Sequence, residues 1–188
     1  MDRAANNALT VTSGYINVSR DKVRGWDFNL RYTRDIGPGK FRLNAKVTNY
    51  LEQGGQALPT QPYKDYSGSI GAPEMTGELD LTYTLRNWKV RYGMDWVGSI
   101  NGYEYYEKYD NVDYRPNYQM KIDDYYLHHM SVQYSGDDWS IIGGIRNIAD
   151  KDPPVISTGA YSVIGNAPLY SGYDYFGRVY FLSFSKKF

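Results

Sequence analysis

The chain has 188 residues, enough for one domain with a sizeable core. Its 21 lysines and arginines balance its 21 aspartates and glutamates, so neither nucleic-acid binding nor an acidic tail is indicated, and the absence of cysteine excludes disulfides and thiolate metal sites. Mean hydropathy is −0.62 and no apolar run approaches the roughly 18 residues of a membrane helix, which excludes a helical membrane protein but not a β-barrel.

The N-terminal region predicts a first strand over residues 8–19, where apolar side chains alternate and Gly14 interrupts the phase. Residues 19–24 read as a short polar connection. No apolar segment with a small-residue cleavage site precedes them. A chain exported from the cytoplasm without such a segment is either a mature form or the C-terminal part of a longer chain.

A clear hairpin follows. Residues 26–32 alternate between large apolar and polar side chains, and the Gly-Pro-Gly at residues 37–39 has strong turn chemistry. The return strand, residues 41–51, alternates in the same way. Residues 53–73 are rich in Gly, Pro, Gln and Ser and predict a long loop.

Four more strands and two long segments complete the pattern. Residues 77–85 and 88–96 form the best-defined hairpin, and residues 101–123 are a tyrosine-rich and carboxylate-rich loop. Residues 126–134 alternate again, although Leu127 interrupts the polar face. After a turn at residues 135–138, residues 139–145 predict a further strand, although Ile142 on its other face weakens the alternation. A loop at residues 149–172 leads to the closing strand.

The closing strand, within residues 173–188, has period-2 alternation and ends on Phe188. On its apolar face Lys186 is the exception, which we explain by snorkelling to the headgroups near the membrane rim. We expect this strand to pair with residues 139–148.

Three features favour a transmembrane barrel over a soluble sandwich. The strands reach about ten residues, the length of a tilted crossing; short and long connections alternate; and the polar faces carry full charges, as a wet lumen permits. The predicted fold is therefore all-β, an antiparallel transmembrane β-barrel segment of about eight meander strands. Short turns would be periplasmic, which places Phe188 at the periplasmic edge.

Residues 144–154, GIRNIADKDPP, resemble the G-V-x-N-L-x-D-x-x-P-P stretch of TonB-dependent receptors. The closing strand that follows is also similar to theirs. The residues that carry this resemblance are Asn147, Asp150, Pro153, Pro154, Gly177, Arg178 and Phe188. We interpret Asn147 and Asp150 as caps of the strand exit and the two prolines as stiffening it.

The resemblance implies that residues 1–188 are a single segment from the C-terminal part of a larger barrel of about 22 strands, without the N-terminal plug and the TonB box. Such a receptor imports a scarce, bulky ligand of the siderophore, cobalamin or oligosaccharide class across the bacterial outer membrane. Its implied partners are outer-membrane lipid, the small-molecule or oligosaccharide ligand, the TonB complex through the missing plug, and the barrel-assembly machinery through the C-terminal strand.

Candidate ligand-binding residues lie in the tyrosine-rich loop, where rings and hydrogen-bond donors could meet a ligand from outside. They are Tyr105, Tyr106, Tyr109, Asp113, Tyr114 and Arg115. An outer aromatic girdle explains the tyrosines nearest the strand ends equally well. The adjacent His128 and His129 point to opposite faces of a strand and cannot chelate one metal together. No catalytic residues, metal site or cofactor are expected.

Three function classes are considered, of which the third, a soluble β-domain enzyme, finds no supporting constellation of catalytic residues. The leading hypothesis is a receptor barrel, which is a transporter and not an enzyme. The alternative is a complete eight-stranded outer-membrane barrel with a structural or adhesion role, whose lumen is filled by side chains.

Overall fold

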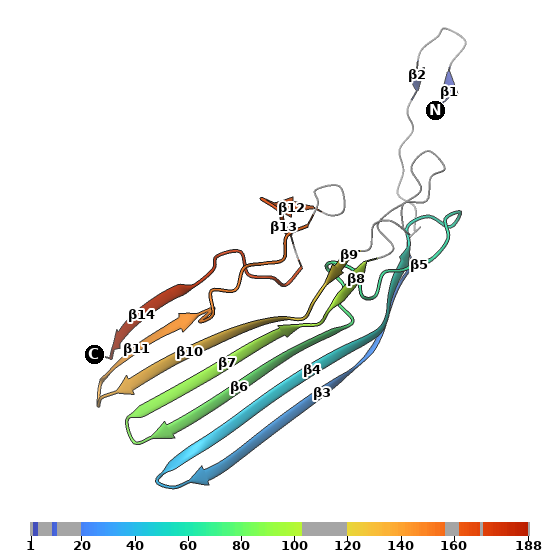
Figure 1. Ribbon diagram of the computed structural model, residues 1–188. Coiled ribbons are helices and arrows are strands. Elements are labelled where there is room, and N and C mark those ends of the chain that lie inside the picture. Colours follow the sequence, from blue (N-terminus) through green and yellow to red (C-terminus); the bar gives the residue numbers. More distant parts are fainter. Residues whose placement is uncertain are drawn as a thin grey trace.

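The computed structural model describes residues 2–3, 9–10, 20–102, 120–156, 162–169 and 171–187, and the regular elements in them are strands (Figure 1). The long strands form one antiparallel sheet in the order β14-β11-β10-β7-β6-β4-β3, and a short β5 pairs with β4. Their bounds are β3 (Arg20–Ile36), β4 (Gly39–Gln56), β5 (Lys64–Asp65), β6 (Met75–Leu85), β7 (Trp88–Val97), β10 (Tyr125–Ser135), β11 (Trp139–Arg146) and β14 (Val179–Lys186).

Three small hairpins lie outside this sheet. They are β1 (Asp2–Arg3) with β2 (Leu9–Thr10), β8 (Ile100–Gly102) with β9 (Met120–Ile122), and β12 (Val163–Ile164) with β13 (Ala167–Pro168). Within the described ranges, no helix is long and apolar enough to cross a membrane.

The connections have two lengths, as the sequence predicts. Tight turns join β3 to β4, β6 to β7 and β10 to β11 at one end of the sheet, and the longer segments gather at the opposite end (Figure 1). Gly37 in the first turn has a φ of 58°, a left-handed conformation that favours glycine. Two of these turns are linked, because the Asn87 side-chain amide donates to the Ser135 carbonyl at 2.6 Å. We call the two ends the turn end and the loop end.

The sheet has one apolar and one polar face. Cross-strand register aligns apolar side chains from all seven long strands in one row: Tyr32, Leu43, Leu81, Tyr92, Met130, Ile145 and Tyr180. The interleaved positions form polar rows such as Arg31, Asn44, Asp80, Gly93 and His129. The apolar face is open to its surroundings, with Phe28 53% exposed and Leu182 76% exposed. An exposed apolar surface of this extent is typical of contact with lipid or another protein.

Aromatic rings border the apolar face at both ends. At the turn end a chain of rings crosses four strands, with centroids of Trp88 and Tyr134 4.8 Å apart, Tyr134 and Trp139 5.4 Å apart, and Trp139 and Phe184 6.1 Å apart. At the loop end Trp96 and Tyr126 stack at 6.3 Å. On β7 the two rows are eight positions apart, about 27 Å along the strand, which suits a tilted membrane crossing.

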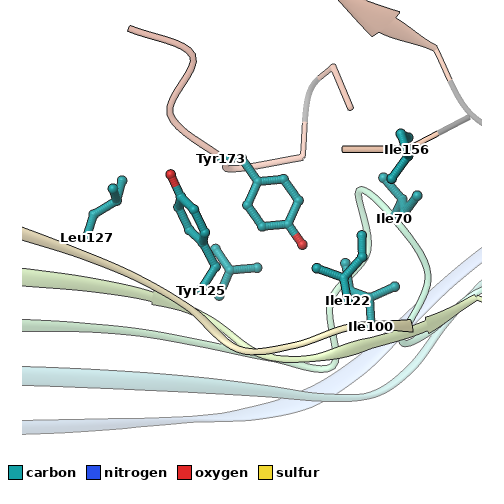
Figure 2. Close-up of a cluster of buried hydrophobic side chains, with 8 residues drawn as sticks. Ile70, Ile100, Ile122, Tyr125, Leu127, Ile156 and Tyr173 are labelled. Carbon is teal, nitrogen blue, oxygen red and sulfur yellow. The ribbon is translucent and has the colours of Figure 1, made fainter. Parts of the chain in front are cut away.

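A buried cluster lies at the loop end on the polar face. Loop residues Ile70, Ile156 and Tyr173 pack there against residues of the sheet and of the β8–β9 hairpin (Figure 2). Leu127, the apolar residue that interrupts the polar face in the sequence, is only 5% exposed and belongs to this cluster. The loops before β6 and before β14 therefore fold back over the polar face.

The described strands differ from the predicted ones in number and in where β3 begins. The predicted first strand, residues 8–19, lies outside the described residues except for the two residues of β2, so seven long strands are described. The prediction of a polar connection at residues 19–24 is wrong, because β3 already begins at Arg20 and pairs with β4 up to Gln56. The predicted pairing of the closing strand is confirmed, since β14 pairs with β11 from Val179 to Lys186.

The sheet is an open segment of a barrel wall. β3 and β14 form its two edges and lie far apart (Figure 1). Among the described residues, nothing pairs with the outer side of either edge strand.

Candidate functional site

Hollows with charged linings lie along the polar face, among them one on each half of the sheet. The first, of about 280 Å³, spans β7, β10, β11 and β14 and is lined by polar and charged groups together with Phe181. Its polar lining comes from Arg91, Asp95, His129, Ser131 and Arg146. The second, of about 480 Å³, spans β3, β4 and β6, and its charged groups are Arg31, Arg42, Lys46, Glu78 and Asp80. Charges of both signs therefore line the polar face of the sheet.

Two charged groups of the first hollow, Arg91 and Asp95, are held by cross-strand contacts. The Arg91 guanidinium binds Asp80 through its Nε at 2.7 Å and through a terminal nitrogen at 2.5 Å. Both nitrogens contact the same carboxylate oxygen, Oδ1, so the pair is a bifurcated contact on one oxygen between β7 and β6. Arg146, at the end of β11, has an exposed side chain and no ion pair within the described part of the chain.

His129 links the hollow to the loop end. Its Nδ1 accepts a hydrogen bond from the Asn147 backbone N–H at 3.2 Å, so the ring proton lies on Nε2, which donates to Asp95 at 2.9 Å. Its neighbour His128 lies on the apolar face with the Tyr92 hydroxyl 2.7 Å from its Nδ1. The prediction that the two histidines face opposite sides is confirmed.

The turn after β11 is organised by Asn147, which is fully buried and has a φ of 52°. Its side chain spans the turn, because Nδ2 donates to the Lys151 carbonyl at 2.9 Å and Oδ1 accepts from the Lys151 N–H at 2.7 Å. The side-chain amide of Asn147 thus makes the two hydrogen bonds, one donated and one accepted, that a backbone peptide group of a neighbouring strand would make. Pro153 and Pro154 follow this turn and are half-buried.

Asp150 joins the two ends of the long loop between β11 and β14. Its Oδ1 accepts from the Arg178 N–H at 2.8 Å, and the Arg178 Nε donates to the Ile148 carbonyl at 3.1 Å. Gly177 has a φ of 68°, and a Cβ there would lie 3.3 Å from the Asp150 Oδ1. The residues that carry the sequence resemblance are therefore brought together here, except Phe188, which lies outside the described residues. Their contacts hold the loop in place and present no reacting group.

The candidate ligand residues Tyr105, Tyr106, Tyr109, Asp113, Tyr114 and Arg115 lie outside the described residues, and their role stays a prediction. The pairing of His129 with Asp95 was not predicted, because it depends on the register of β10 against β7. In the described ranges no group of three or more metal-binding side chains comes together.

Burial shapes the chemistry of the loop cluster. Tyr173 is 4% exposed, and burial raises the pKa of its phenol to about 12. Its hydroxyl has no hydrogen-bond partner within the described residues. Asp65, in the other loop, accepts from the N–H and the hydroxyl of Ser67, and these hydrogen bonds hold the pKa of its carboxyl below the usual value.

Comparison with protein families gives one decisive result. The profile of the TonB-dependent receptor-like β-barrel family matches residues 2–148, most of the chain. The chain belongs to this family. TonB-dependent receptors are outer-membrane transport receptors rather than enzymes. The match includes Asn147 and ends before Asp150, so it covers only part of the residues on which the sequence resemblance rests.

The structure of a bacterial receptor has a similar fold. The chain resembles a variant of the ferric enterobactin receptor PfeA of Pseudomonas aeruginosa with a TM-score of 0.57 and 16% identity. The alignment covers 88% of this chain and 22% of that receptor, so the chain spans about a fifth of its length. No curated protein matches the chain. At this identity the similarity shows the barrel-wall fold alone.

Proposed function

We propose that this chain is the C-terminal portion of the barrel of a TonB-dependent receptor in the bacterial outer membrane. The receptor takes up a scarce, bulky ligand of the siderophore, cobalamin or oligosaccharide class. The chain contributes barrel strands and outer loops and performs no enzymatic step. Coupling to the TonB complex runs through a plug region outside residues 1–188.

The observation that carries this proposal is the family match over residues 2–148, together with a sheet that has two chemically different faces. A wall with lipid on one side and water on the other needs this alternation on every strand. The two edge strands support a larger barrel, since open edges in hydrocarbon leave backbone groups unpaired at several kcal/mol each.

The loop end supports a ligand-facing role. The described parts of the segment between β11 and β14 are tied down by Asp150 and Arg178 and bury Tyr173 against the polar face, which supports a role as a wall at the mouth of the lumen. Next to this wall lies the β8–β9 hairpin, which leads into the tyrosine-rich loop. In this arrangement the apolar face contacts outer-membrane lipid, and β14 is the strand presented to the barrel-assembly machinery.

Uptake by the full-length receptor tests the proposal. Cells expressing it are supplied with an iron-labelled siderophore panel, cobalt-labelled cobalamin and labelled oligosaccharides, with and without TonB. Uptake of one class that disappears without TonB is expected. If no class depends on both the receptor and TonB, the proposal is refuted.

The loop residues are tested by paired substitutions. Replacing Tyr105, Tyr106 and Tyr109 by Ala should weaken binding of the transported ligand to the purified receptor, while replacing them by Phe keeps the stacking surface. Equal affinity of the Ala and parent receptors would remove these tyrosines from the ligand site. The alternative of a complete eight-stranded barrel is tested by reading the coding DNA upstream of Met1, where we expect several hundred codons for a plug and further strands.

A further inference from the structure

The backbone ladder between β10 and β11 is interrupted by the imidazole ring of His129. The two strands pair in register as far as Met130, and beyond the interruption the Ile148 N–H donates to a backbone carbonyl of β10. Between these positions the Asn147 N–H donates to the His129 Nδ1, at 3.2 Å. A ring nitrogen therefore takes the place of a carbonyl oxygen at the base of the turn after β11.

The two partners of this hydrogen bond differ in exposure. Asn147 is fully buried, so its N–H reaches water only when the turn opens. The side chain of His129 is 21% exposed and lines the hollow of about 280 Å³ on the polar face. A proton from the solvent can therefore reach the ring while the turn is closed.

Protonation of the ring conflicts with this hydrogen bond. Neutral imidazole accepts at one nitrogen and donates at the other, whereas the imidazolium ion donates at both. With a proton on Nδ1, two donors would face each other across 3.2 Å, and the buried Asn147 N–H would lose its acceptor. Opening of the turn relieves this conflict, because both donors then reach water.

The contact of His129 with Asp95 leaves this preference unchanged. It joins Nε2 to a carboxylate oxygen at 2.9 Å, and the two residues lie on neighbouring strands of the sheet, β10 and β7. Asp95 therefore stabilises the imidazolium ion whether the turn is closed or open. Only the hydrogen bond at Nδ1 differs between the two states. Since the open turn binds more protons, acid favours opening.

The other charged groups around the ring do not reverse the sign. Asp80 on β6 and Arg91 on β7 pair with each other, and β14 contributes an aromatic ring and no charge to the hollow. Glu78, also on β6, lies opposite Asp95 and stays on the sheet. Arg146 on β11 adjoins the turn, and its displacement would lower the repulsion of an imidazolium ion, which acts in the same direction. The charged side chains of the loop are exposed and make no contact with the ring within the described residues: Asp150, Lys151, Asp152 and Arg178.

We propose that His129 makes the turn after β11 sensitive to pH: the neutral ring holds the turn closed, and the protonated ring releases it. His129 is a positioning residue in this role, because it acts through the Asn147 N–H. Asp150 ties the turn to the Arg178 N–H just before β14, so both ends of the long loop loosen together. The inference goes beyond the proposed function, because it concerns local opening of the barrel wall and does not depend on the transported ligand.

Hydrogen–deuterium exchange of the full-length receptor at about pH 5.5 and 7.5 tests the proposal, with each rate divided by the intrinsic rate of that amide at that pH. The amides of Asn147, Asp150 and Arg178 report the turn, since all three donate hydrogen bonds in the closed state. An imidazole with a midpoint near pH 6.5 is about 90% protonated at pH 5.5, so the corrected exchange should be about tenfold faster there than at pH 7.5. Ordinary carboxylates titrate below this range.

Two variants assign the effect to one ring. The amide of His129→Gln can accept from the Asn147 N–H and donate to Asp95 but does not titrate, so this variant should lose the pH dependence. His128→Gln is the matched control, because it removes the other histidine of the chain, which bonds to Tyr92 on the apolar face. It should keep the tenfold acceleration in acid.

Two results would overturn the proposal. One is corrected exchange in the parent that is equal at the two pH values or slower in acid. The other is an acceleration in acid that persists in His129→Gln, because it would assign the pH dependence to another group. If His129→Gln lowers protection at both pH values, the ratio of its two rates remains the criterion, and a ratio near one supports the proposal.

Discussion

Replacing Asn147 tests whether the turn after β11 is held by one side chain. Asn147→Ala removes both hydrogen bonds to the Lys151 backbone, each worth roughly 0.5–1.5 kcal/mol. It also places alanine at a φ of 52°, which costs about 1–2 kcal/mol more. We therefore expect a loss of about 3 kcal/mol in the free energy of local opening.

Hydrogen–deuterium exchange of the full-length receptor measures this loss. The Asp150 N–H donates to the Asn147 carbonyl, and the Arg178 N–H donates to the Asp150 carboxylate, so both amides report opening of the turn. A loss of about 3 kcal/mol corresponds to exchange faster by roughly two orders of magnitude. Asn166→Ala, at an exposed turn of the same loop, is the control and should stay within about 0.5 kcal/mol.

Glycine at this position separates the two contributions. Asn147→Gly loses the same hydrogen bonds but adopts the left-handed conformation without strain, so it should be less damaging than Asn147→Ala by about 1 kcal/mol. Exchange in Asn147→Ala as slow as in the parent would refute the reasoning about the side chain. Equal exchange in the glycine and alanine variants would refute the reasoning about the backbone.

Three further predictions concern the loops. Tyr173→Phe should leave the free energy of unfolding in denaturant unchanged or raise it by about 1 kcal/mol, because the buried hydroxyl has no partner within the described residues. Tyr173→Ala should lower the same free energy by about 3–5 kcal/mol, because it leaves a cavity. Gly177→Ala should make the loop between β11 and β14 more sensitive to protease, since alanine at a φ of 68° costs about 1–2 kcal/mol; normal resistance would contradict this. The lowered pKa of Asp65 means that the unfolded loop binds more protons, so its stabilisation is present above about pH 4 and is lost as pH falls through the folded pKa. Hydrogen exchange of residues 57–73 should accelerate in that acidic range, and Asp65→Asn should abolish this pH dependence.

The sheet could be predicted from the sequence because each of its faces carries a different type of side chain. Lipid requires apolar side chains and the lumen tolerates charges, so alternation identifies each spanning strand and the tight turns fix the order of pairing. At Arg20–Gly25 the sequence pattern is misleading for a physical reason. This part of β3 extends beyond the apolar row, where neither face needs hydrocarbon contacts, so the strand carries charges on alternate positions and resembles a connection.

The loop end was harder to predict. Leu127 was visible as an exception, but the partners that bury it, including Ile156 and Tyr173, come from a distant loop without periodicity. The pairing of His129 with Asp95 likewise depends on register and not on spacing. The six candidate ligand residues in the tyrosine-rich loop remain a sequence prediction.

Because of the two aromatic rows, tryptophan fluorescence can measure how deeply the chain lies in a bilayer. Its four tryptophans all lie on the apolar face, Trp26 and Trp96 toward the loop end and Trp88 and Trp139 toward the turn end, and none lies between the two rows. Their emission therefore comes only from the two boundaries of the bilayer. Quenchers placed at the lipid midplane should reach this fluorescence poorly, and quenchers near the headgroups should reach it well, which would reveal correct insertion without any attached label.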